Sequence, residues 1–214
     1  MPMQLTHLGH SAVLVEVADQ RILIDPGNFS DAWHDLTDLD AVVVTHLHPD
    51  HIDPEQLPKL LAANPDARLI VEPSVPDKYD LPNAERLPAD SSVTVGAAQI
   101  ATVGGEHAVI HRDIPMIGNV GVLIRAEGEP TLFHPGDSLA AVPSGVDVLA
   151  LPAMGPWAAL KEHIDFARQV AAPRGFLIHE ALISDRGWGL MSNRLGEMTP
   201  TELTDLRDGT PLTL

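Results

Sequence analysis

Short apolar segments separated by turn residues fill the first third of the chain. Residues 5–8, 12–17 and 21–24 have the length and apolar content of strands, and a tight turn is expected between the last two. Residues 41–44 form a continuous apolar run with three valines, which is typical of a strand buried on both faces. This part of the chain is therefore predicted to be rich in β-structure.

Patterns typical of helices begin after residue 53. A helix is predicted over residues 54–63, because Asp53 can cap it and Pro54 suits the first helical position. A second is predicted over residues 157–172, where apolar residues recur at helical spacing. Residues 199–202 read Thr-Pro-Thr-Glu, a capping box that predicts one short final helix.

More strands alternate with these helices. They are predicted at residues 68–71, 92–95, 99–103, 120–125, 131–133, 147–151 and 175–178. Strands come first and are later mixed with helices, which favours an α/β sandwich over a doubly wound sheet. No glycine-rich phosphate loop follows the first strand. The length of 214 residues fits a single domain, 1–214.

Composition narrows the chemistry. The chain has no cysteine, which excludes disulfides, thiolate nucleophiles and cysteine-ligated zinc. Any metal must be held by histidine nitrogens and carboxylate oxygens. The formal net charge of −17 disfavours nucleic acid and anionic membrane surfaces as partners. The chain shows no signal peptide and no apolar run of membrane-spanning length, so a cytoplasmic location is expected.

The strongest chemical signal is the segment Thr45-His46-Leu47-His48-Pro49-Asp50-His51, directly after the 41–44 strand. Alternate residues of an extended chain point to the same side, so His46 and His48 can reach one metal together. After the turn at Pro49, Asp50 and His51 can approach a second position. Imidazole and carboxylate ligands suit zinc, manganese or iron. The alternative is a polar loop with accidental histidines.

The order of motifs resembles the metallo-β-lactamase-fold hydrolases. The His-x-His-x-Asp-His segment is the signature of that family. Around it, Gly9-His10-Ser11 and the Asp25-Pro26 turn resemble the start of that fold, while His134-Pro135-Gly136-Asp137-Ser138 resembles its Gly-Asp-Ser/Thr segment. Within the superfamily the chain is most similar to the L-ascorbate-6-phosphate-lactonase-like group.

This resemblance implies a four-layer αββα sandwich with two mixed β-sheets, and a binuclear metal site. Carried over by position, it implies a first metal held by His46, His48 and His107, and a second held by Asp50, His51 and His179. Asp137 would bridge both, and Asp25 and Thr45 would orient ligands. Two divalent ions are expected, with zinc favoured and manganese or iron as alternatives.

Such a centre implies hydrolysis. Two metals can hold a hydroxide and polarise a carbonyl or phosphoryl oxygen. Asp50 is the expected catalytic residue, because it could orient the hydroxide and carry a proton to the leaving group. The expected substrate is a small-molecule ester, lactone or phosphodiester.

Candidates for substrate binding are less well marked. They are His10, Arg112, Trp157, Arg186 and Trp188. Packing is the alternative role for the two tryptophans. His111 competes with His107 as a ligand, and the spacing to Asp137 favours His107.

Two other functions stay open. One is an iron-dependent oxidoreductase on the same fold, although flavodiiron proteins replace the second histidine of the motif with glutamate, and here that position is His48. The other is a non-catalytic metal-binding protein. The oligomeric state is open as well, with a homo-oligomer among the alternatives.

Overall fold

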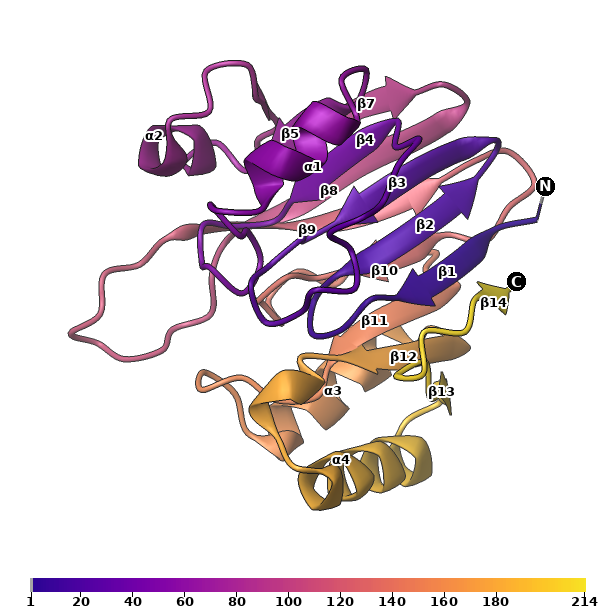
Figure 1. The fold of residues 1–214 in the computed structure, drawn as a ribbon. Helices are drawn as coiled ribbons and strands as arrows, with labels where there is room; N and C mark the ends of the chain where they lie inside the picture. Colours follow the sequence, from indigo (N-terminus) through magenta and orange to yellow (C-terminus); the bar gives the residue numbers. More distant parts are fainter. Residues whose placement is uncertain (1) are drawn as a thin grey trace.

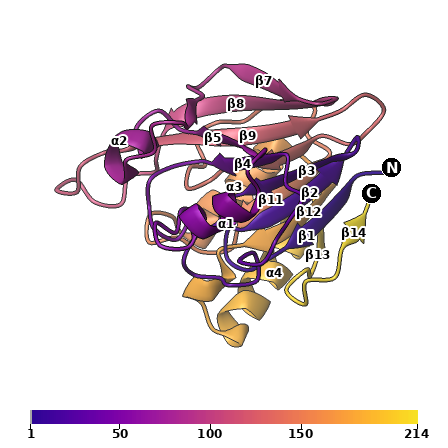
Figure 2. The same ribbon diagram turned by 45° about the horizontal axis from the view of Figure 1, so that its top comes forward.

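Two β-sheets pack face to face and helices cover their outer faces (Figures 1 and 2). The structure is a computed structural model that describes residues 2–214. The first sheet has the strand order β14-β1-β2-β3-β4-β5-β6, and the second has the order β13-β12-β11-β10-β9-β8-β7. Both sheets contain parallel and antiparallel pairs. The predicted four-layer αββα sandwich with two mixed sheets is confirmed.

The strands of the first sheet are β1 (Gln4–His7), β2 (Val13–Val17), β3 (Gln20–Ile24), β4 (Ala41–Val44), β5 (Arg68–Val71), β6 (Glu85–Arg86) and β14 (Leu212–Thr213). Those of the second are β7 (Ser92–Val95), β8 (Ala98–Glu106), β9 (Gly118–Arg125), β10 (Leu132–His134), β11 (Val148–Pro152), β12 (Arg174–Ile178) and β13 (Glu202–Thr204). The helices are α1 (Leu57–Ala63), α2 (Val75–Tyr79), α3 (Leu160–Val170) and α4 (Asp185–Met198), and a 3₁₀ turn spans Glu180–Leu182.

Strand β4 shows how the layers are held together. Its four residues are all buried, and successive side chains point to opposite faces. Ala41 and Val43 join the apolar cluster between the two sheets. Val42 and Val44 join the cluster under α1 and α2. A third cluster, which includes Phe133 and Phe166, fills the layer under α3 and α4. The continuous apolar run therefore reflects burial on both faces, as predicted.

The same edge of the sandwich collects the polar residues. Asp25 follows β3, Thr45 follows β4, His107 follows β8 and His179 follows β12. Strands β3 and β4 are parallel, as are β11 and β12, so their carboxyl ends lie at one edge of each sheet. The two sheets bring these edges together, and this is where the candidate site lies.

The final helix was predicted in the wrong place. The strand β13 follows at Glu202–Thr204, and the helix is α4, which ends at Met198 with Thr199 as its C-cap. The hydroxyl of Thr199 donates to the Leu195 carbonyl at 2.7 Å, so the threonine closes a helix instead of starting one. Three glycines in α4 weaken its helical pattern, which explains why the sequence did not reveal it.

Other boundaries differ by a few residues. The first helix begins at Leu57 because Asp53 caps the turn before it, where its Oδ1 accepts from the backbone of Glu55 and Gln56. The short elements α2, β6 and β14 gave no signal in the sequence. Within residues 2–214, no helix has both the length and the apolar character needed to span a membrane.

Gly27 offers a test of how tightly the site loops are packed. A Cβ atom at this position would lie 1.8 Å from the carbonyl oxygen of Asp50. We therefore expect Gly27→Ala to lower the free energy of unfolding by about 1–3 kcal/mol, measured by urea denaturation. Gly189→Ala in α4 is the matched control, since no atom lies within 4 Å of its added carbon. The control should be neutral or stabilising by up to about 1 kcal/mol. Equal effects of the two changes would contradict this packing.

Candidate metal centre

One buried carboxylate, that of Asp137, lies among four imidazoles. Its Oδ1 is 2.7 Å from Nε2 of His179 and 3.1 Å from Nε2 of His51. Its Oδ2 is 3.4 Å from Nε2 of His107 and 4.0 Å from Nε2 of His46. The two oxygens thus address different pairs of histidines, which divides the site into two halves.

The first half contains His46, His48, His107 and Asp137. One potential ligand atom from each lies within 4.8 Å of the others. Nε2 of His46 is 3.2 Å from Nδ1 of His48, so these two rings present different nitrogens to the same point. The two rings lie together, as the sequence predicted, but residues 46–48 form a bend after β4, so the extended chain assumed in that prediction is not observed.

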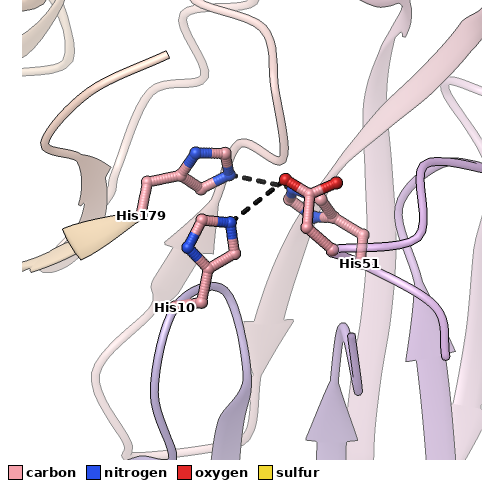
Figure 3. Close-up of side chains that lie close together, drawn as sticks. His10, His51 and His179 are labelled. Carbon is pink, nitrogen blue, oxygen red and sulfur yellow. Dashed lines mark hydrogen bonds and ion pairs between the residues drawn. The ribbon is translucent and has the colours of Figure 1, made fainter. Parts of the chain in front are cut away.

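The second half contains His10, Asp50, His51 and His179, which meet the same 4.8 Å limit. Figure 3 shows the rings of His10, His51 and His179 directed toward one another. Nε2 of His51 lies 2.9 Å from Nε2 of His179, and Nε2 of His10 lies 3.1 Å from Oδ2 of Asp50. The predicted second group therefore lies together, and the structure adds His10 to it.

A fully buried carboxylate behind the site orients two of these rings. Oδ1 of Asp25 accepts from the backbone N–H of Thr45 at 2.8 Å, and Oδ2 accepts from its hydroxyl at 2.7 Å. The same Oδ2 is 2.6 Å from Nδ1 of His51. The hydroxyl oxygen of Thr45 is in turn 3.0 Å from Nδ1 of His46. Hydrogen bonds at Nδ1 leave Nε2 of both rings directed into the site.

The ring of His107 is also fixed by a hydrogen bond at Nδ1, in this case to a backbone carbonyl. Its Nδ1 lies 2.7 Å from the carbonyl oxygen of Ala108, which accepts its proton. Its Nε2 is buried and makes no hydrogen bond. Oδ1 of Asp137 is also buried, and although it lies close to Nε2 of His179 and His51, neither contact has the geometry of a hydrogen bond. Buried polar atoms are rarely left without a partner. A cation among these atoms would satisfy both, so the residues present fit a metal ion.

Titration of the imidazoles agrees with ligand roles. Burial lowers the pKa of His46 well below its usual value, and burial also lowers the pKa of His48. Both rings are therefore neutral at pH 7, the form that binds metal. Burial alone would lower the pKa of His51, but the carboxylates of Asp137 and Asp25 raise it well above its usual value. A metal would have to displace that proton.

The carboxylates are held in their charged form. Burial would raise the pKa of Asp137, but the nearby imidazoles of His179 and His51 keep it well below its usual value. Burial would also raise the pKa of Asp50, but the hydrogen bond from His10 and the nearby imidazoles of His51 and His179 together outweigh it and lower the pKa to about 2. Anionic oxygen ligands are thus available across the neutral range.

Three residues of the site adopt the left-handed backbone conformation, which is uncommon outside glycine. They are His10 with φ 53°, Asp25 with φ 49° and His179 with φ 66°. Such conformations persist only where the surroundings enforce them, and they gather at functional sites. Here the hydrogen bonds around each residue supply that enforcement.

The turn at His10 is clamped between the two sheets. Its carbonyl oxygen accepts from the backbone of His179 at 2.9 Å and lies 2.9 Å from Nε2 of His7. Its N–H donates to Glu180 at 2.7 Å. The next residue, Ser11, donates from its hydroxyl to the Asp50 carbonyl at 2.7 Å. The β1–β2 turn is therefore fixed directly over the second half of the site.

The predicted substrate residues lie in different places. Trp157 is at the site, and its Nε1 donates to Oδ2 of Asp137 at 2.9 Å. Arg112 is exposed on the 107–117 loop and lies 3.8 Å from Asp113. Arg186 is exposed on α4. Trp188 packs on the opposite side of β12, where the guanidinium of Arg207 lies 3.7 Å above its ring. The structure does not bring these last three to the site.

Several supporting residues were not among the predicted site residues. Asn119 accepts the N–H of Asp137 at 2.9 Å and donates to the Pro135 carbonyl. Glu180 and Ser11 hold the His10 turn, as described above. His111, the alternative to His107, is exposed and outside both groups. These contacts join residues far apart in the chain, so only the fold reveals them.

Comparison with known proteins identifies the family. Residues 4–174 match the family described as "Beta-lactamase superfamily domain". The chain belongs to the β-lactamase superfamily. Protein Rv0786c of Mycobacterium tuberculosis is 40% identical over 212 residues, which cover 99% of this chain and 100% of that protein.

One further relative and one solved structure are similar to the chain. A UPF0173 metal-dependent hydrolase of Saccharolobus solfataricus is 30% identical over 147 residues, which cover 63% of this chain and 61% of that protein. The metallo-beta-lactamase fold protein YhfI of Bacillus subtilis has the same fold, with a TM-score of 0.76 at 16% identity over 99% of both chains. The predicted class, a metal-dependent hydrolase of this superfamily, is confirmed. The nearer likeness to the lactonase-like group stays a prediction.

Asp25 tests the orientation of the ligands. The side-chain amide of Asp25→Asn would place an N–H group opposite Thr45 and His51, which now donate hydrogen bonds to the carboxylate. We expect the affinity for Zn²⁺ to fall by roughly 10- to 100-fold in a titration against a competing chelator. Asp53→Asn is the control, because Asp53 is a buried aspartate that caps a turn and contacts neither group. Wild-type affinity in Asp25→Asn would show that the rings need no such support.

His10 tests the charge of Asp50. His10→Phe removes the donor at 3.1 Å, so the pKa of Asp50 should rise from about 2 toward its usual value. A depressed carboxyl pKa stabilises the fold above the unfolded pKa and loses that effect as pH falls through the folded pKa. In metal-free protein, the variant should therefore be less stable than the wild type at neutral pH. The gap should narrow below pH about 6.5, because the lowered pKa of buried His10 destabilises only the wild type there, and it should narrow further from pH about 4 toward pH 2 as Asp50 is protonated. A gap independent of pH, measured by urea denaturation, would contradict this.

Proposed function

We propose that this chain is a binuclear metallohydrolase. His46, His48 and His107 would hold one divalent ion, and Asp50, His51 and His179 the other, with Asp137 shared between them. The observation that carries the proposal is the split of Asp137, whose Oδ1 addresses His51 and His179 and whose Oδ2 addresses His46 and His107. Zinc suits these nitrogen and oxygen donors best, with manganese and iron as alternatives.

When bound, two such ions polarise the substrate oxygen and lower the pKa of the attacking water toward neutrality. The chain's own residues do the positioning. The imidazoles are fixed from behind by Asp25, Thr45 and the Ala108 carbonyl. Their orientation before binding removes reorganisation from the reaction, which is how a rigid polar site favours a transition state.

Asp50 is the proposed catalytic carboxylate. It is less buried than Asp137, with 19% of its side chain exposed against 5%. The hydrogen bond from His10 keeps it ionised, so it can accept a hydrogen bond from the attacking water and align it. With a pKa of about 2 it holds a proton poorly, and orienting the water is therefore its main role.

The same site supports a hydrolase acting on a small-molecule ester, lactone or phosphodiester. No lysine or arginine lines the site in the part of the chain that the structure describes, and the net charge is −17. Both features support the expectation that nucleic acid is not the substrate. The cytoplasmic location remains a prediction.

The test is the metal content of the purified protein, with His46→Ala and Asp137→Asn alongside. We expect about two zinc or manganese ions per chain in the wild type, a clear loss in His46→Ala and a larger loss in Asp137→Asn. Ester and lactone hydrolysis should fall by roughly a hundredfold or more in both variants. His111→Ala, an exposed histidine outside both groups, is the control and should keep metal and activity.

Two results would overturn the proposal. A single iron per chain with oxidase or oxygenase activity would favour the oxidoreductase. A wild-type metal content in Asp137→Asn would refute a shared ligand.

A further inference from the structure

A hollow of about 380 Å³ opens beside the metal centre. The ring of His107 and the indole of Trp157 form its inner end, and both contact Asp137. Its other walls include Val109, Met116 and Leu139. The hollow is therefore continuous with the proposed reaction site, and a bound molecule could reach both.

The outer wall is unusually apolar for an exposed loop. The 107–117 loop joins β8 to β9 and projects from the body of the protein (Figure 1). It carries Val109, Ile114 and Met116, which are 61%, 49% and 50% exposed. They account for three of the nine large apolar side chains exposed among residues 2–214, and all three lie at the hollow or at a smaller one beside it. Clustered exposed apolar groups mark a binding surface.

The hollow offers nothing to an anionic group. Neither it nor the smaller hollow is lined by a lysine or arginine from the described residues. The carboxylates of Glu106 and Glu162 stand at its rim. Arg112, the only cation in the 107–117 loop, is 87% exposed and directed at Asp113. Recognition of a phosphate away from the proposed metal ions requires cationic donors in fixed positions, and this hollow provides none.

We infer that the enzyme hydrolyses uncharged esters or lactones that carry an apolar chain, and that the hollow holds this chain beside His107 and Trp157. The inference rests on the proposed function and narrows it, because substrates that would place a phosphate in the hollow, such as phosphorylated lactones, are set aside. In the reaction, the water oxygen bonds to the carbonyl carbon and the ester C–O bond breaks. One water proton passes to the leaving alcohol oxygen, and the carboxylic acid formed loses its own proton to solvent.

The first experiment uses zinc-loaded protein and γ-lactones whose alkyl side chain grows from methyl to pentyl. Each methylene that enters the hollow should raise kcat/KM by roughly fourfold until the hollow is filled. A lactone of matched length with a terminal phosphate should react at least about tenfold more slowly than its uncharged counterpart. Rates that do not change with chain length, or that favour the phosphorylated lactone, would overturn the inference.

A pair of matched variants locates the effect. Met116→Lys places a cation in the hollow and should flatten the chain-length dependence while narrowing the gap to the phosphorylated lactone. Met198→Lys is the control, because Met198 is similarly exposed, at 42%, but lies at the end of α4. The control should leave both trends unchanged. Equal behaviour of the two variants would show that the chain binds elsewhere.

Binding of alkyl hydroxamates separates this inference from the proposed function. Calorimetry with zinc-loaded protein should show affinity rising by roughly fourfold per methylene from aceto- to octanohydroxamate. If affinity rises but no ester or lactone is hydrolysed, the hollow stands as an apolar pocket and the hydrolase proposal fails. If lactones are hydrolysed but hydroxamate affinity is flat or absent, the hydrolase stands and the apolar pocket is wrong.

Discussion

The structure depends on the burial of one carboxylate, Asp137, among imidazoles from distant parts of the chain. Removing a charge from water is costly unless close partners replace the solvent. His51, His107 and His179 lie within 3.4 Å of its oxygens, and the indole of Trp157 donates at 2.9 Å. These partners come from both sheets, so the carboxylate can be satisfied only when the sandwich is assembled. Divalent cations would complete this compensation.

A second set of hydrogen bonds surrounds the residues that contact Asp137 and holds them in place. Asp25 reaches both the backbone and the side chain of Thr45, and it fixes the ring of His51 from behind. The clamp between His10 and Glu180 ties the two sheets together at the same edge. These hydrogen bonds hold residues in left-handed conformations that the chain would otherwise avoid. These backbone conformations lower the stability locally, and they fix the directions of the ligands. Functional sites often combine the two.

The ligands of the His46–His51 segment could be predicted from the sequence because they are neighbours in the chain. The signal at His46, His48, Asp50 and His51 is local, because one bend and one turn directly after β4 determine where these side chains point. The position of His10 is different, since it approaches Asp50 across 40 residues and Glu180 across 170. Arg186 and Trp188 were expected near the substrate because they follow a predicted strand end, and Arg112 because of its charge, but the fold directs all three elsewhere. Helix α4 was missed because its glycines weaken the periodicity that marks a helix.

The most direct test of the account is electron paramagnetic resonance of the protein loaded with Mn²⁺. If Asp137 is shared between two ions, their spins must be coupled, and the spectrum should show the closely spaced hyperfine pattern of an exchange-coupled pair. In Asp137→Asn that pattern should disappear. A wild-type spectrum of isolated six-line Mn²⁺ signals, at full loading with two ions per chain, would contradict a shared carboxylate and with it the central claim.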